Sequence, residues 1–307
     1  MRKFFKKEDG AVLMLFALLM PVVLGCAAMV VDFGIQYGSK VRLQNIAQAA
    51  ALAASQDALQ DPSVARDKAY EYLHLNGVQA HEAQVEISQP EGSAYVAVTR
   101  ESDYYFARIL GFRTADISAN AKAVSVGISS FTGAAPLGIM SEDFVYGQKY
   151  KLKYGSPPEL GSGNFGALRL GGSGANNYEY NLKHGYPGEL KVGDIVNIEP
   201  GNMSGPTRRA IEYRFAQDNR IPPNTFYDHD RNAPQILYVP VVEPYGVSGS
   251  HVHSVRILGF AAFFVTGIPG SGNESEIEGY FIRTVKSGGG SEGQANYGLT
   301  TSRLVNP

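Results

Sequence analysis

The acidic segment 228–232 contains the residues of this sequence that are best suited to bind a metal ion. Asp228, Asp230 and Asn232 place oxygen donors at alternate positions, as the start of a Ca²⁺-binding loop does. The glycine expected at the sixth position of an EF-hand loop is Ala233, and the glutamate expected at the twelfth position is Val239, so an EF-hand is excluded. A looser Ca²⁺ loop and a solvated turn stay open as alternatives, and Ca²⁺ is the only cofactor that the sequence suggests.

Histidine and serine residues supply the other candidates for chemistry. His251 and His253 are two residues apart and would share one face of a strand, where they could contribute to a metal site. Ser204 or Ser250 could act as a nucleophile only if the fold brought a histidine and an acid to it. Sequence reasoning alone therefore names no catalytic residue.

Two glycine-rich stretches, 161–166 and 170–174, have the composition of phosphate-binding loops. A phosphate cradle also needs a strand before it and the start of a long helix after it, and the flanking residues indicate neither. The segment 199–207 combines Pro and Gly with side chains that bond the backbone, which is typical of an ordered loop. No cofactor-binding residue is assigned.

Composition excludes several functional classes. The chain has 307 residues, a net charge of −2 and 18% charged residues, so it offers no basic field for nucleic acid. Its single cysteine, Cys26, excludes an intramolecular disulfide and any zinc site built on several cysteines.

The element that must position everything else is the apolar run 11–31. About 20 apolar residues cross a bilayer as a helix, and Pro21 would bend such a helix mildly. Basic residues concentrate in 1–10, before the run, and the positive-inside rule therefore places 1–10 in the cytoplasm. We expect a single-pass cell-membrane protein that contacts the lipid bilayer and whose later residues are extracytoplasmic.

Two processing sites compete with an uncleaved signal anchor. The segment 23–26 resembles a lipobox ending in Cys26, although the apolar run continues beyond that cysteine. A basic leader that ends in Gly10 resembles a prepilin leader, although Leu15 stands where prepilins carry glutamate.

Beyond the span, residues 32–60 are expected to continue the helix outside the membrane. Asp32 marks the exit, and Gly34 and Gly38 have the small-xxx-small spacing that permits close helix approach; the alternative is that these glycines simply lie at the interface. A stripe with helical spacing follows, formed by Leu43, Ala47, Ala50, Ala54 and Ala58. Such a stripe suits packing on a small domain or on a neighbouring subunit, so a helix-mediated oligomer stays open.

The segments 16–21, 32–34 and 43–54, together with Tyr37, resemble the N-terminal domain of TadE/TadG-like proteins. These proteins belong to the tight-adherence (Flp, type IVb) pilus assembly system. One departure is Gln48, where family members often carry aspartate. The resemblance implies a membrane-anchored pilus component or assembly factor without enzymatic activity, whose partners are other Tad/Flp proteins.

The remaining sequence predicts an α+β fold with two further parts. Residues 61–130 predict a small pilin-like α+β unit, with a helix from Asp61-Pro62 to Asn76-Gly77 and then, in order, strands at 83–88 and 95–100, a short helix or turn at 104–111, and a strand at 117–126. Residues 131–285 predict a β-rich barrel or sandwich, with strands at 149–154, 164–170, 195–198, 235–242, 255–265 and 277–283.

Two details of that β-rich part follow from its apolar runs. The runs 236–239 and 259–265 are nearly continuous and predict central strands that are buried on both faces, with Pro240 at a strand end or bulge. Residues 286–307, after this part, predict a flexible tail.

The sequence favours a structural or assembly role, and an anchored extracytoplasmic hydrolase or Ca²⁺-dependent binding module is the alternative.

Overall fold

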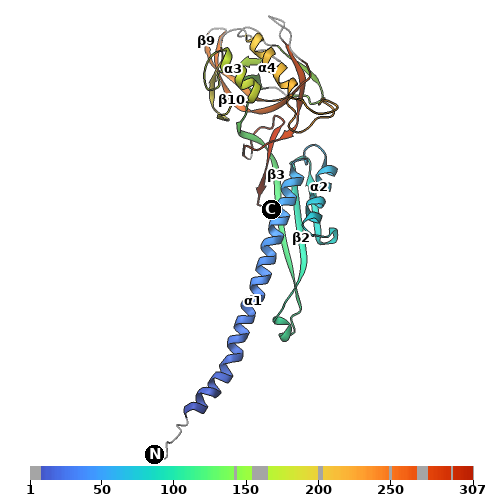
Figure 1. Ribbon diagram of the computed structural model, residues 1–307, viewed down its shortest axis with the longest axis vertical. Helices are drawn as coiled ribbons and strands as arrows, with labels where there is room; N and C mark the ends of the chain where they lie inside the picture. Colours follow the sequence, from blue (N-terminus) through green and yellow to red (C-terminus); the bar gives the residue numbers. More distant parts are fainter. Residues whose placement is uncertain are drawn as a thin grey trace, which may run out of the picture. The chain divides into compact units, whose positions relative to one another are not determined.

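The computed structural model describes residues 8–141, 144–153, 165–199, 203–248, 251–267, 276–291 and 293–306. The chain forms two compact units (Figure 1). The first comprises Met1–Val124 with Leu304–Pro307, and the second comprises Ser125–Arg303. The predicted α+β class, with a long apolar N-terminal helix and a β-rich domain, is confirmed.

The first unit begins with α1 (Glu8–Ser55), a single helix of 48 residues. It joins the predicted membrane span to the predicted alanine-rich extension without interruption. Pro21 lies inside it and does not end it, because a helix loses only about one backbone bond at a proline that its surroundings tolerate. The alanine-rich half keeps the helix intact because alanine has the highest helix propensity.

The rest of the first unit is a helix and a β-hairpin. Its elements are α2 (Pro62–Leu75), η1 (Ala80–Glu82), β1 (Ala83–Ser88), β2 (Ser93–Asp103), η2 (Ala107–Leu110) and the first part of β3 (Thr114–Thr132). The carboxylate of Asp61 caps α2 by accepting hydrogen bonds from the backbone N–H groups of Ser63 and Val64, as an N-cap aspartate does. Ala65, Ala69 and Leu73 form the buried face of α2, and Tyr72 is exposed.

Strands β1, β2 and β3 form an antiparallel sheet with β2 in the centre. Figure 1 shows α1 running alongside β2 and β3, with α2 beside its C-terminal end. One hydrophobic cluster joins the alanine-rich half of α1, α2 and the inward side chains of the sheet. α2 contributes Leu73, and the sheet contributes Val96, Val98 and Ile117. The hairpin and the third strand were predicted correctly, although β3 is longer at both ends than the expected 117–126.

The second unit is built around a mixed sheet with the order β5-β11-β10-β9-β4-β6, to which β8 adds by pairing with β10. Its strands are β4 (Leu137–Met140), β5 (Lys149–Lys153), β6 (Phe165–Ala167), β8 (Ile195–Asn197), β9 (Ile236–Ser248), β10 (His251–Val265) and β11 (Glu276–Ile282). The end of β3 pairs with β7 (Glu189–Lys191) and β13 (Gly289–Gly290). In addition, β12 (Thr284–Val285) pairs in parallel with β14 (Leu299–Val305).

The central strand β10 is buried on both faces, as its apolar run predicted. Phe263 and Val265 belong to one hydrophobic cluster, and Phe260 and Phe264 belong to another. Strand β9 runs through Pro240, which pairs with Phe260, and the nearest register shift is between Ile257 and Gly259 of β10. The proline therefore lies beside a bulge and within the strand, not at its end.

Two helices in the second unit were not predicted. α3 (Ala175–His184) and α4 (Ser204–Ala216) contribute Tyr178, Leu182 and Ile211 to one of the two hydrophobic clusters around β10. The segment expected to be an ordered loop, 199–207, thus leads into α4. These helices are short and have few apolar residues, so their periodicity is weak in sequence, and packing on the sheet stabilises them.

The expectation of a flexible tail over 286–307 is wrong for the described residues. Strands β13 and β14 lie in this segment, and Leu299 is fully buried. The glycines serve close packing: a Cβ atom on Gly288 would approach the carbonyl oxygen of Ser130 to 2.7 Å, and one on Gly290 would meet Thr301 at 2.5 Å. A glycine-rich composition here reflects the lack of space for side chains, not mobility.

Candidate functional site

The N-terminal half of α1 presents its apolar side chains outward. Side chains from Val12 to Val31 are exposed, with only Ala28 partly covered. In the described part of the chain, α1 is the one helix that is long and apolar enough to cross a membrane. Exposed apolar surface of this extent is costly in water, so the predicted membrane anchor is supported by the structure as well as by the sequence.

The C-terminal half of α1 buries most of the predicted stripe. Leu43, Ala47, Ala50 and Ala54 are 0–2% exposed and pack on the first unit's own α2 and sheet. Ala58 is also buried, but it lies in the turn after α1, which ends at Ser55 and not at the expected residue 60. Of the two partners that the sequence left open, a small domain and a neighbouring subunit, the structure therefore supplies the domain. Alanine suits this face because its small side chain lets the helix approach closely.

Asp32 fastens the end of the β2–β3 hairpin to α1. Its carboxylate accepts backbone hydrogen bonds from Tyr105 (2.8 Å), Phe106 (3.0 Å) and Ala107 (2.7 Å), and the residue is 4% exposed. These N–H groups precede and begin η2, where a short helix leaves its first donors without partners. A carboxylate at this point satisfies them with charge-assisted bonds.

Two further polar side chains of α1 bind the same strands. Gln36 donates to the carbonyl oxygen of Asp103 at 3.1 Å, and Gln44 donates to the carbonyl oxygen of Asn120 at 2.7 Å. Asp103 also forms an ion pair with Arg108 at 2.6 Å. The hairpin is thus held along α1 from Asp32 to Gln44.

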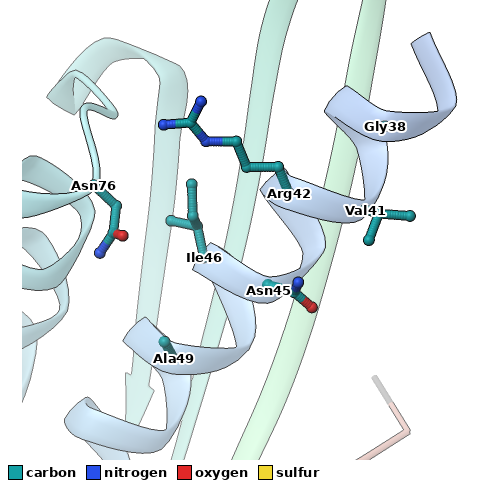
Figure 2. Close-up of a pocket in the computed structure, with 7 residues that line it drawn as sticks. All are labelled: Gly38, Val41, Arg42, Asn45, Ile46, Ala49 and Asn76. Atoms are coloured by element: carbon teal, nitrogen blue, oxygen red, sulfur yellow. The ribbon is translucent and has the colours of Figure 1, made fainter. Parts of the chain in front are cut away.

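Gly34 and Gly38 lie away from the hairpin. Asp32 and Gln36 of α1 contact the hairpin. Each glycine is two residues from one of these positions, which is about 200° around the helix. A Cβ atom on either glycine would meet nothing within 4 Å. Beside Gly38, α1 and Asn76 border an open hollow of about 370 Å³, over which the side chain of Arg42 extends (Figure 2). Close approach of a second helix to these glycines stays a prediction.

The comparisons with known proteins concern this helix. A family model described as "Putative Flp pilus-assembly TadE/G-like" matches residues 10–59. Residues 10–59, the TadE/G-like segment, are thus similar to this family. No curated protein and no solved structure matches the chain. The TadE/G-like segment thus begins near the start of α1 and ends just after it, and it contains Asp32 but not the hairpin residues that Asp32 binds.

Both candidate processing residues lie in the TadE/G-like segment. Gly10 is within the first turn of α1, and Cys26 is exposed on the apolar half of the helix. A cut after Gly10 would leave nearly all of α1 intact, whereas a cut before Cys26 would remove its first part and shorten the apolar half. Neither processing event is tested by the structure, and both stay predictions.

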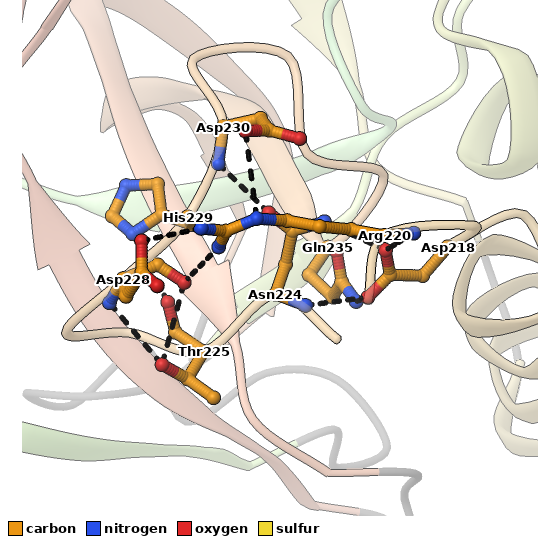
Figure 3. A network of polar contacts seen from close by, with 8 residues as sticks. All are labelled: Asp218, Arg220, Asn224, Thr225, Asp228, His229, Asp230 and Gln235. Carbon is orange, nitrogen blue, oxygen red and sulfur yellow. Dashed lines mark hydrogen bonds and ion pairs between the residues drawn. The ribbon is translucent and has the colours of Figure 1, made fainter. Parts of the chain in front are cut away.

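The predicted Ca²⁺-binding residues belong to a polar network in the second unit (Figure 3). Arg220 donates to the carboxylate of Asp228 at 2.6 Å and lies 3.7 Å from a carboxylate oxygen of Asp230. The hydrogen bond with Asp228 raises the pKa of Arg220 above its ordinary value. Asn232 lies outside this pair and accepts a hydrogen bond from Lys286.

The structure therefore gives these carboxylates a guanidinium as their cationic partner. Among the described residues, no group of three or more His, Cys, Asp or Glu side chains is arranged to hold a metal ion. Within the same network, Asp218 accepts hydrogen bonds from Asn224 and Gln235. The arrangement orders the loop before β9, and a looser Ca²⁺ loop stays an open alternative.

The other candidate residues that the structure describes lie on different elements. Ser204 begins α4 and His253 is exposed on β10, whereas Ser250 and the side chain of His251 lie outside the described residues. Residues 289–293 have the letters Gly-x-Ser-x-Gly of a nucleophile elbow, which requires a strand, a sharp turn and a helix. β13 at this place is followed by no helix in the described residues.

The glycine-rich stretch 170–174 leads directly into α3, but a side chain already occupies the start of that helix. The backbone N–H of Gly174 donates to a carboxylate oxygen of Glu199 at 2.7 Å, and the other oxygen of Glu199 accepts from Arg169 at 3.0 Å. Glu199 is buried. The chain thus supplies its own anion where a phosphate would bind, and the stretch 161–164 lies outside the described residues.

Arg214 is a buried cation that sequence reasoning did not identify. Its guanidinium donates to the carbonyl oxygens of Lys183 and Ile236, joining α4 to α3 and β9. Burial lowers the pKa of Arg214 to about 10, and burial raises the pKa of the nearby Tyr238 to about 12. These contacts hold the two helices against the sheet and offer no open site.

The most informative residues that sequence reasoning missed are the partners of Asp32. The sequence indicated Asp32 as a membrane exit marker and 104–111 as a short apolar helix or turn. The available signal was a lone carboxylate at the end of an apolar helix together with an apolar loop tip. Only the fold shows that the two meet.

Proposed function

We propose that this protein is a membrane-anchored structural or assembly component of a tight-adherence (Flp-type) pilus system. The single observation that carries the proposal is that the TadE/G-like residues 10–59 coincide with one continuous helix. One half of that helix is exposed and apolar, and the other half holds a folded unit.

The proposed mechanism is structural. The N-terminus is cytoplasmic because the basic residues precede the span, and both folded units are extracytoplasmic. The apolar half of α1 holds the protein in the bilayer and packs with helices of the pilus machinery. The second unit contacts partners or the envelope, and no catalytic step is part of the proposal.

Deletion and complementation in the bacterium of origin tests the proposal. We expect deletion of the gene to reduce the number of surface pili seen by electron microscopy, and the full-length chain to restore it. A chimera in which an unrelated single-pass helix replaces residues 11–31 is the matched control. It should reach the membrane but restore pili poorly, because it lacks the helix that contacts the machinery.

Two outcomes would count against this function. Pilus number unchanged by the deletion would remove the assembly role, and a chimera as active as the natural chain would reduce α1 to a simple anchor. Protease digestion of spheroplasts tests the orientation separately. Both units should be digested from outside, and a protected second unit would reverse the topology.

The competing class is an anchored extracytoplasmic hydrolase or Ca²⁺-dependent binding module. In the described residues, Arg220 accompanies the acidic pair Asp228 and Asp230. Loss of Ca²⁺-dependent melting on replacing both aspartates would favour the binding module over the structural role.

A further inference from the structure

The tip of the β2–β3 hairpin carries an unusual set of exposed apolar side chains. Ile109 is 85% exposed, Leu110 is 74% exposed and Phe112 is 64% exposed. Tyr105 and Phe106 of the same tip are also exposed. Loop tips in water are normally polar, and a contiguous exposed apolar patch marks a surface that something else covers.

This tip lies beside the membrane half of α1. Asp32, directly after the predicted span, holds it through the backbone N–H groups of residues 105–107. From that point the tip turns back along the helix: Ile109, Leu110 and Phe112 border the same apolar groove as Pro21 and Leu24. Pro21 precedes Asp32 by eleven residues, which is roughly 16 Å along a helix at about 1.5 Å per residue.

The backbone of the tip is prepared for an environment without water. Inside a bilayer each backbone polar group must find a partner within the protein. Asp32 accepts from three successive N–H groups, and further bonds run from Tyr104 to Arg113, from Ile109 to Phe106 and from Phe112 to Ala107, donor first. Such closure is unnecessary in a loop that water surrounds.

The polar residues of the tip match a membrane surface. Arg108 and Arg113 are exposed, and Tyr104 and Tyr105 precede the apolar part. Arginine can direct its charged end to the headgroups while its stem lies against apolar surface, and tyrosine is enriched at the interface. Along the tip, tyrosine and arginine residues therefore flank the apolar side chains on both sides, as expected for a segment at a membrane interface.

We propose that the β2–β3 tip, residues 104–113, inserts into the outer leaflet beside α1, so that lipid acyl chains cover Ile109, Leu110 and Phe112. The proposal rests on the membrane anchoring within the proposed function. The protein would then contact the membrane twice, through α1 and, less deeply, through the tip. This second contact would fix the orientation of the first unit on the membrane surface. We assign lipid as the covering partner because Asp32 holds the tip at the end of the predicted span and the tip borders the same groove as Pro21 and Leu24 within it.

The test uses the full chain in lipid vesicles with a fluorophore on one cysteine at a time. The native Cys26 gives the lipid reference. In a Cys26→Ala background, Leu110→Cys and Ile109→Cys report on the tip, and Glu71→Cys on the exposed side of α2 gives the water reference. Quenching by lipids brominated in their acyl chains is compared with quenching by iodide in the buffer.

We expect labels at Leu110 and Ile109 to be quenched by brominated lipid at least half as strongly as the Cys26 label. Their quenching by iodide should be several-fold weaker than at Glu71. If the tip labels behave like the Glu71 label while the Cys26 label lies in lipid, the tip proposal is wrong and the anchor stands. If the Cys26 label is also in water, both fail.

A second copy of the chain is the other occupant that the test can detect. Tip labels that are shielded from iodide but unaffected by brominated lipid, and that become exposed on dilution of protein in the vesicles, would assign the patch to a protein contact and overturn the proposal. A charged variant, Leu110→Asp, adds an independent measurement. It should raise iodide quenching of a label at Ile109 several-fold without releasing the protein from the vesicles.

Discussion

The alanine stripe of α1 allows a sharp test because the same substitution can be made on its packed side and on its open side. Ala50 is 0% exposed and belongs to the cluster with α2 and the sheet. Ala49, the next residue, borders the open hollow of about 370 Å³ (Figure 2). We expect Ala50→Leu to destabilise the first unit strongly and Ala49→Leu to have little effect.

The magnitude follows from the lack of space around Ala50. Leucine adds three carbon atoms to a site that is closed on all sides, and overpacking of this kind costs about 1–3 kcal/mol. The difference in helix propensity between alanine and leucine is only a few tenths of a kcal/mol. For a domain of this size, the expected loss lowers Tm by roughly 5–20 °C.

The assay is thermal unfolding of the full-length protein in detergent micelles, followed by circular dichroism. Because the chain has two compact units, pulse proteolysis that follows fragments of the first unit assigns its transition. At Ala49 the added side chain enters the hollow, so Tm should stay within about 2 °C of the natural protein. Equal losses for the two variants, or no loss for Ala50→Leu, would refute the packing of the stripe on its own domain.

Three further predictions concern the polar contacts. Asp32→Ala should accelerate amide hydrogen exchange at residues 105–107, because their backbone donors lose the carboxylate that accepts them. The hydrogen bond from Arg100 lowers the pKa of Glu82 from 4.5 to about 2. The stability that this pair contributes is therefore present above about pH 4.5 and is lost as the pH falls towards 2. Thermal unfolding at pH 6 and at pH 3 measures this loss. Addition of millimolar Ca²⁺ should leave the melting of the second unit unchanged, because Arg220 already pairs with its acidic residues.

Each of these has its own control. Asp61→Ala removes another capping carboxylate and should accelerate exchange only at the start of α2; faster exchange at the hairpin tip in that variant would argue against a local role for Asp32. Glu82→Gln should be less sensitive to acid between pH 6 and pH 3 than the natural protein, and an unchanged pH profile would show that the ion pair contributes nothing. A Ca²⁺-dependent rise in Tm that Asp228→Asn abolishes would restore the Ca²⁺ loop.

The sequence was most informative where local physics decides the structure. The apolar run, the alanine stripe and the N-cap at Asp61 each depend on neighbours within one or two turns. The strands of the hairpin and the runs around β9 and β10 could be located for the same reason, because alternation and apolar length are local properties. The anchor and the TadE/G-like resemblance therefore needed no tertiary information.

Segments whose form depends on distant neighbours could not be predicted. The short helices α3 and α4 are stable because they cover the central sheet. The glycines around residue 290 looked like a flexible tail because their composition does not reveal the backbone that packs against them. In the same way, the acidic residues at 228 and 230 could not disclose that Arg220, eight residues before Asp228, pairs with both of them.

Asp32 shows most clearly what the sequence by itself determined and what only the tertiary structure decided. The sequence placed a carboxylate at the end of an apolar helix and an apolar tip about 75 residues later, and it predicted a membrane anchor from the first of these alone. The fold brings the tip's backbone donors to that carboxylate and its apolar side chains to the depth of the span. Hydrogen bonds between residues so far apart are decided by packing, and no local pattern encodes them.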